Sequence, residues 1–164
     1  ASITIPKSVN LIEFAAFAGC TNLTSVTIPN TLTSIESYAF KGCTSLRSVN
    51  VWDGVTSIRS NSTLIGISAF EGCTSLASVS IPNGVTSIEF RAFKGCTSLA
   101  SVPIPNSLTS IDSDAFYGCT SLVSVTIPNG VKWIGNSAFE GCTGLVSVTI
   151  PNSVTSIGTN AFHN

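Results

Sequence analysis

Residues 73–95 read CTSLASVSIPNGVTSIEFRAFKG, and residues 96–118 read CTSLASVPIPNSLTSIDSDAFYG. Nearly the same unit recurs along the whole chain. Successive cysteines keep the spacing of these two units, except that one copy carries seven extra residues between Cys43 and Cys73. The Ala-Phe dipeptide places phenylalanine at Phe17, Phe40, Phe70, Phe93, Phe116, Phe139 and Phe162. A fixed period of this length is typical of a solenoid, in which each repeat forms one coil.

The apolar pattern within a unit predicts two extended segments. In the first, Val26 and Ile28 alternate with Ser25 and Thr27, which predicts a short strand with aliphatic side chains inside and hydroxyls outside. Pro29 ends that strand because proline has no N–H to donate to a ladder. A second alternating stretch, such as residues 85–88, follows the corner. The Ala-Phe pair before a glycine then predicts a single helical or 3₁₀ turn.

A unit this short cannot bury its own apolar face, so neighbouring coils must stack. We therefore predict a mainly β repeat solenoid, a right-handed coil of seven units with a parallel sheet on one face, spanning residues 1–164 as one domain. The seven extra residues are placed at about 59–65, in the third coil. Neither end carries a cap, so the sequence indicates a piece of a longer chain that associates end to end when isolated.

Composition excludes several classes of function. Only 9% of the residues are charged, and seven Lys and Arg against eight Asp and Glu give a net charge of -1. Binding to nucleic acid through phosphates needs clustered basic residues, so we expect no nucleic-acid partner. No apolar run approaches the roughly 18 residues of a membrane span, so membrane insertion is not expected. The first residues, ASITIPKSVN, lack the basic and apolar segments of a secretory signal.

The repeat L-x-S-V-x-I-P-N, followed by V-T-S-I and A-F-x-G-C, resembles the BspA-like leucine-rich repeats of bacterial and protist surface proteins. The resemblance covers essentially the whole chain and implies a leucine-rich-repeat coil. The usual leucine-rich-repeat asparagine is absent, since Thr31, Ser107 or Gly130 stands at that position. The resemblance also implies a secreted or cell-surface protein that adheres to host proteins or to other cells.

The chemistry-bearing residues favour neither catalysis nor a bound cofactor. The six cysteines, at positions 20, 43, 73, 96, 119 and 142, lack the close pairs that zinc sites use, and His163 is the only histidine. Stacked in register, they are interpreted as a ladder of buried free thiols rather than as disulfides. Serine and threonine are abundant, but a serine nucleophile needs a base, and His163 stands at the penultimate position. We therefore expect no enzyme, no metal and no cofactor.

The third coil departs most from the repeat and is the first candidate for partner binding. It contains Arg47 and Trp52, and arginine and tryptophan are common in binding hot spots. Its extra loop is also a usual place for binding residues. The other interpretation is neutral sequence drift, because a longer loop costs little additional loop-closure entropy. Trp133 replaces a consensus serine and is expected to be a separate, outward-facing aromatic residue. The candidate partner-binding residues are Arg47, Asn50, Trp52, Asp53, Arg59 and Trp133.

Three functions remain open at this point. The first is a non-enzymatic interaction or adhesion module whose outward Ser and Thr rows meet a protein or glycan, such as host matrix or a cell surface. The second is an ice-binding hydroxyl array, and the third is a structural spacer without a ligand. Two sequons, at Asn22 and Asn61, would be modified only in a eukaryotic secretory route.

Overall fold

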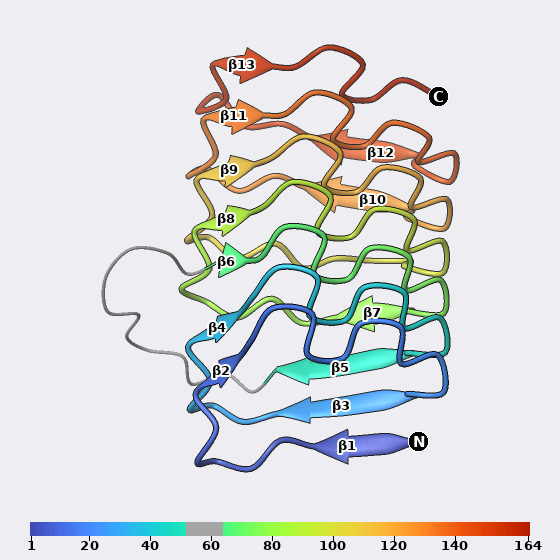
Figure 1. The fold of residues 1–164 in the computed structure, drawn as a ribbon. Helices are drawn as coiled ribbons and strands as arrows, with labels where there is room; N and C mark the ends of the chain where they lie inside the picture. Colours follow the sequence, from blue (N-terminus) through green and yellow to red (C-terminus); the bar gives the residue numbers. More distant parts are fainter. Residues whose placement is uncertain (52–63) are drawn as a thin grey trace.

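The computed structural model describes residues 1–51 and 64–164. These residues form a β solenoid in which each repeat makes one coil, and the coils stack along one axis from the N-terminus to the C-terminus (Figure 1). The described part of the chain contains thirteen short strands and no helix. The first segment forms a strand in six of the coils: β1 (Ser2–Thr4), β3 (Ser25–Ile28), β5 (Ser48–Val51), β7 (Ser78–Val79), β10 (Ser124–Thr126) and β12 (Ser147–Thr149). We call these six strands the TIP sheet.

The second segment of each coil forms another parallel sheet, which we call the second sheet. Its strands are β2 (Leu11–Ile12), β4 (Ser34–Ile35), β6 (Leu64–Ile65), β8 (Ser87–Ile88), β9 (Ser110–Ile111), β11 (Trp133–Ile134) and β13 (Ser156–Ile157). All seven are hydrogen-bonded neighbours in one sheet. The prediction of a parallel sheet on one face is therefore incomplete, because both extended segments of the repeat pair with their copies.

Coils pair strictly in register. Val26 pairs with Val49, and Ile88 pairs with Ile111, so identical repeat positions lie directly above one another. Because side chains alternate along a strand, the Val and Ile of the repeat pattern face inward and its Ser and Thr face outward, whereas Leu11 takes an outward serine position and is exposed. The single repeat pattern thus produces continuous ladders of like residues.

Pro103 interrupts the TIP sheet. At this position other coils have Thr, Ser or Asn, whereas Pro103 has no N–H to donate. The TIP sheet is accordingly divided into β1-β3-β5-β7 and β10-β12, which only isolated bridges of Ser101 to Ser78 and Ser124 connect. β7 is also short, since its partner coil cannot continue the ladder beyond Val102.

The Ala-Phe segments form single turns with 3₁₀-type hydrogen bonds, one of the two predicted forms, and do not extend into helices. Lys41 N donates to Tyr38 O at 3.0 Å within the turn, but Phe40 N donates to Ala69 O of the next coil at 2.8 Å. Alternate N–H groups therefore point along the solenoid axis, so no helical run can form. Each turn is closed by two residues with positive φ, for example Tyr38 at 62° and Gly42 at 70°.

The core is a stack of phenylalanine rings surrounded by Leu, Val, Ile and Cys. Neighbouring rings are nearly parallel, with centroids from 5.1 Å (Phe17 to Phe40) to 5.4 Å (Phe40 to Phe70) apart. The predicted Ala-Phe ladder is confirmed. All six cysteines are free thiols, but only five are buried, because Cys20 lies in the first coil and is exposed. The prediction that every thiol is buried is wrong for Cys20.

The predicted insertion at residues 59–65 lies outside the described residues except for its last two. Leu64 and Ile65 form β6, and Ile65 pairs with both Ile35 and Ile88. They therefore occupy the ordinary second-strand position of their coil. Seven residues separate Ile28 from Ile35, whereas fourteen separate Val51 from Ile65, so the extra residues precede Ile65.

Candidate interaction surface

Three of the predicted binding residues, Arg47, Asn50 and Trp133, lie within the described part of the chain. Arg47 is exposed just before β5, and Asn50 lies within β5, where its backbone pairs with Thr27. Trp133 lies in β11 of the second sheet and is half-buried, not fully outward. Trp52, Asp53 and Arg59 lie outside the described residues.

The outward Ser and Thr rows of the TIP sheet are present as predicted. Thr4, Thr126 and Thr149 are exposed, and Thr27 is half-buried. The rows do not form one regular array, since the sheet divides at Pro103. The face also carries few charged or aromatic side chains among the described residues, which leaves few anchors for tight binding.

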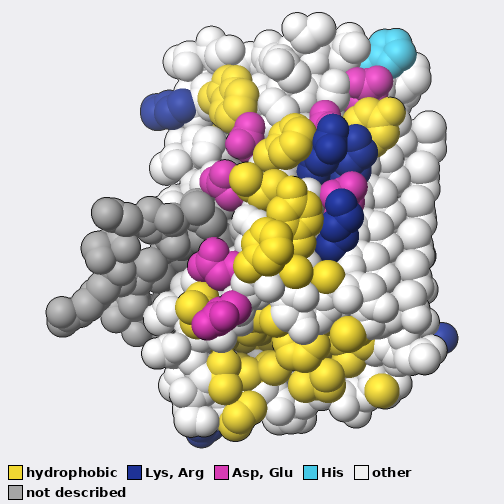
Figure 2. Space-filling view, viewed as in Figure 1, with side chains coloured by type: hydrophobic (Ala, Val, Ile, Leu, Met, Phe, Trp, Pro, Cys, Tyr) yellow, Lys and Arg dark blue, Asp and Glu magenta, His cyan; other side chains and the backbone are white. Residues whose placement is uncertain are grey.

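Most of the charged side chains, and the tyrosines and phenylalanines outside the core stack, lie on a different surface. It consists of the segments that follow the second strand of each coil, residues 13–18, 36–41, 66–71, 89–94, 112–117, 135–140 and 158–163, and we call it the turn face. Ten of the fifteen charged residues of the chain lie in these segments, as do both tyrosines and both phenylalanines outside the core stack. Figure 2 shows them as a hydrophobic band bordered by acidic and basic side chains.

Aromatic side chains of the turn face contact neighbours in the same and adjacent coils. Phe14, whose side chain is 69% exposed, meets Tyr38 edge to face with ring centroids 5.4 Å apart. Ile67 and Tyr117 are also exposed, at 38% and 37%. Arg91 lies over the ring of Phe90 at 4.5 Å. These contacts line up exposed apolar groups over several coils, which is typical of an interaction surface.

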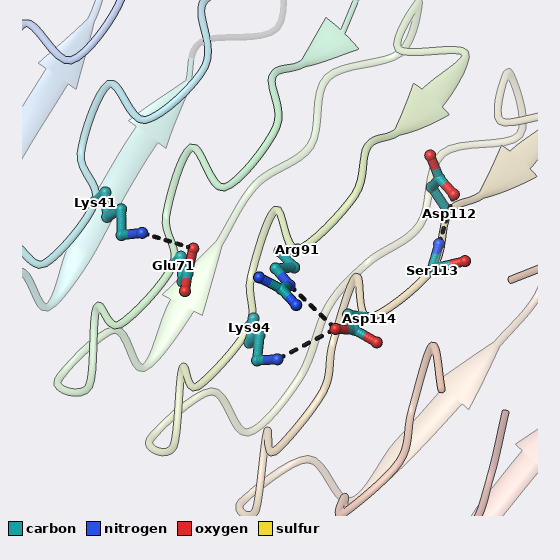
Figure 3. A network of polar contacts seen from close by, with 7 residues as sticks. All are labelled: Lys41, Glu71, Arg91, Lys94, Asp112, Ser113 and Asp114. Atoms are coloured by element: carbon teal, nitrogen blue, oxygen red, sulfur yellow. Dashed lines mark hydrogen bonds and ion pairs between the residues drawn. The ribbon is translucent and has the colours of Figure 1, made fainter. Parts of the chain in front are cut away.

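Each basic residue of the turn face already has an acidic partner (Figure 3). Lys41 Nζ is 3.2 Å from Glu71 Oε2, and both Arg91 Nε and Lys94 Nζ are 3.1 Å from Asp114 Oδ2. Burial opposes ionisation of Glu71, but hydrogen bonds from Ser68 and Lys41 and the charges of Lys41 and Arg91 lower its pKa below the ordinary value. The three cations therefore share two carboxylates within the protein.

A second set of carboxylates has no such partner. Glu13, Glu36, Glu89 and Asp112 share one repeat position, directly after the second strand, and we call them the acid row. Among the described residues none of the four forms an ion pair. Ser34 Oγ donates to Glu36 Oε1 at 2.8 Å, and Ser87 Oγ donates to Glu89 Oε1 at 2.7 Å. Local hydroxyls thus orient the carboxylates of Glu36 and Glu89.

Sequence reasoning missed the turn face because it considered the residues before Ala-Phe within single units and did not compare them between units. A signal was available, since these positions vary between coils while the strand positions hardly vary. Aligning the units by their Ala-Phe pairs places Glu13, Glu36, Glu89 and Asp112 in one column. Stacking in register then requires that they form a row.

No metal-binding group of three or more His, Cys, Asp or Glu side chains occurs within residues 1–51 and 64–164. The buried thiols donate to carbonyls, as Cys73 Sγ does to Phe40 O at 3.1 Å. Burial raises the pKa of Cys43 to about 11 and that of Cys73 to about 12, so these side chains are neutral thiols. In the part of the chain that is described, no helix has the length and apolarity needed to cross a bilayer.

Comparison with known proteins settles the family. The model of the BspA type leucine rich repeat region matches residues 1–64 and 63–164, in six copies. The chain belongs to the BspA-type leucine-rich repeat family. This assignment confirms the resemblance in the strand and Ala-Phe motifs, and BspA-type repeats are typically not enzymes. No curated protein sequence gives a significant match.

Solved structures of bacterial proteins, including leucine-rich repeat proteins, show the same architecture. A leucine-rich repeat protein of Treponema pallidum (T. pallidum) aligns with 29% identity and a TM-score of 0.58, over 96% of this chain and 72% of that one. A leucine-rich cell surface protein of Faecalibacterium prausnitzii aligns with 29% identity and a TM-score of 0.61, over 98% and 66%. The pneumococcal vaccine antigen PcpA shares the fold at 22% identity and a TM-score of 0.57, with 96% and 54% covered. Similar chains thus include bacterial surface proteins.

Proposed function

We propose that this chain is a non-enzymatic adhesion module of a secreted or cell-surface protein, and that it binds a protein or glycan partner through the turn face. One observation carries the proposal: ten of fifteen charged residues, together with every Phe and Tyr outside the core stack, lie on this one face. Folding alone does not need them, because other coils have Gly, Ser, Asn or Ala at the same positions. The similar Faecalibacterium chain is a cell surface protein, which supports the location.

Adhesion experiments with matched surface variants test the proposal. The chain is presented to fibronectin, laminin and a glycan array, and binding is compared with that of a turn-face variant (Phe14→Ser, Ile67→Ser, Tyr117→Ser). A TIP-sheet variant (Thr4→Ala, Thr126→Ala, Thr149→Ala) serves as the matched control. We expect the turn-face variant to lose binding by about tenfold or more, because exposed aromatic and aliphatic side chains are typical hot spots.

Other outcomes would contradict the proposal. Loss of binding only in the TIP-sheet variant would place the surface on the Ser and Thr rows. Loss only on replacing Arg47 and Trp52 with Ala would place it in the third coil. Binding by neither the chain nor its variants would favour the spacer. Thermal hysteresis tests the ice-binding alternative, which the break of the sheet at Pro103 disfavours.

A further inference from the structure

The turn face has an excess of negative charge. Its segments hold seven acidic and three basic residues. The three basic residues are already paired with Glu71 or Asp114. The acid row forms no ion pair within the described residues, so positive charge is what this surface lacks. A partner that supplies Lys or Arg side chains would be complementary to it.

A notch opens in the acid row at the third coil. There Gly66 takes the position that carries Glu36 in the preceding coil and Glu89 in the following one. A Cβ on Gly66 would lie 2.6 Å from the carbonyl carbon of Glu36 and from the amide nitrogen of Ser37, so the close approach of the two coils requires glycine. Beside Gly66 lies a cavity of about 140 Å³, lined by Ser34, Ile35, Glu36, Ser37, Gly66, Ile67 and Glu89.

Apolar side chains lie beside this notch. Ile67, which is 38% exposed, forms part of its wall, and the band of hydrophobic side chains in Figure 2 runs along the acidic side chains. Phe90 is half-buried in the next coil. Acidic and apolar groups therefore alternate within one surface, which favours a partner with both basic and apolar side chains. A neutral sugar would leave the two carboxylates without a counter-charge.

We propose that the turn face docks a polypeptide segment rich in basic and apolar side chains, with one Lys or Arg side chain seated between Glu36 and Glu89. This rests on the proposed function and names the partner class of the same face. The neighbouring apolar side chains of the segment pack on Ile67 and Phe90. The serine hydroxyls at positions 34 and 87 hold the two carboxylates in place before the partner arrives, which reduces the cost of ordering on binding.

Three synthetic peptides and the whole chain test this inference. Each peptide has three copies of a Gly-X-Y triplet, with X-Y as Leu-Arg, Ser-Arg or Leu-Glu. Binding is measured by amide chemical shifts and by titration. We expect the Leu-Arg peptide to bind about tenfold or more tightly than the Ser-Arg peptide, with shifts at residues 34–37, 66–67 and 89–90. The Leu-Glu peptide should not bind, since its charge is repelled.

Variants that remove charge but keep side-chain shape test whether the peptide binds at the notch. The double variant Glu36→Gln, Glu89→Gln keeps the shape and the serine hydrogen bonds, and we expect it to weaken binding of the Leu-Arg peptide by about tenfold. The variant Glu140→Gln removes a charge from the same face three repeats away from Gly66 and should change binding by at most about twofold. Equal losses in both variants, equal binding of the Leu-Arg and Ser-Arg peptides, or no peptide binding would overturn the inference.

The two proposals fail in different ways. If the turn-face variant loses adhesion to a matrix protein while the Glu36, Glu89 double variant keeps it and no peptide binds, the adhesion module stands and the notch is wrong. If the Leu-Arg peptide binds the notch while adhesion survives the turn-face variant, the notch stands and the adhesive surface lies elsewhere. A neutral oligosaccharide that produces the same amide shifts would make the notch a glycan site and overturn the polypeptide assignment.

Discussion

The ring of Phe70 stacks on the ring of Phe93 with centroids 5.3 Å apart and planes 4° from parallel. Phe93 stacks equally on Phe116 and is fully buried, so its removal leaves a cavity in the middle of the ladder. We expect Phe93→Ala to lower the free energy of unfolding by about 3 to 5 kcal/mol. Phe14→Ala, on the exposed turn face, should cost less than about 1 kcal/mol. Denaturant unfolding measures both, and similar losses would contradict the burial difference.

The thiols should divide into one reactive and five protected groups. Cys20 is exposed in the first coil, whereas the other five cysteines are buried. A thiolate is the reactive species, and burial disfavours it at each protected position. We expect one thiol per chain to react rapidly with a thiol reagent under native conditions and five more after unfolding in denaturant. Protection of all six thiols, or fewer than six in the unfolded, unreduced chain, would contradict the structure.

Alkaline pH should destabilise the fold through the cysteine ladder. Burial raises the pKa of Cys73 from 9.0 to about 12, so the native state keeps a proton that the unfolded state loses. This contribution to stability is complete below pH 9.0 and declines as the pH rises from there toward about 12. Each such thiol adds up to about 1.4 kcal/mol of loss per pH unit. In Cys73→Ala the slope of unfolding free energy between about pH 9 and 10 should be shallower by that amount. An unchanged slope would show that the thiol is not desolvated.

Repairing the break in the TIP sheet should stabilise it. Pro103→Thr restores the N–H and the hydroxyl residue found in β3 and β10 at this position, and we expect a gain of about 0.5 to 1.5 kcal/mol from the added hydrogen bond. Slower exchange of amides near β7 would locate the gain. As a control, Thr126→Val changes a residue within an intact ladder and should shift stability by less than about 0.5 kcal/mol. A destabilised Pro103→Thr chain would mean that the break is needed for packing.

The strands and the core followed from the repeat alone, because stacking in register turns one pattern into ladders. Val26, Pro29 and Phe93 each specify a backbone state or a buried position that every copy repeats. The positive φ at Tyr38 and Arg91 did not follow, since no glycine marks these positions. The turn face was missed because its acid row and its ion pairs form between side chains of different coils. Asp114 contacts Arg91 from the equivalent region of the next coil, and a reading within one unit does not bring them together.

Gly66 provides a direct test of the notch. Its hydrogens allow the backbone of the third coil to approach Glu36 and Ser37, where a Cβ would lie 2.6 Å from two backbone atoms. These atoms belong to the hydrogen-bonded second sheet and its turn, so they cannot move aside as a flexible side chain would. We therefore expect Gly66→Ala to lower the free energy of unfolding by about 1 to 3 kcal/mol. The neighbouring Ser37→Ala, at a half-buried position, should change it by less than about 0.5 kcal/mol. Wild-type stability of Gly66→Ala in thermal unfolding would show that the coils lie farther apart there, and the cavity between Glu36 and Glu89 would then not be fixed by glycine.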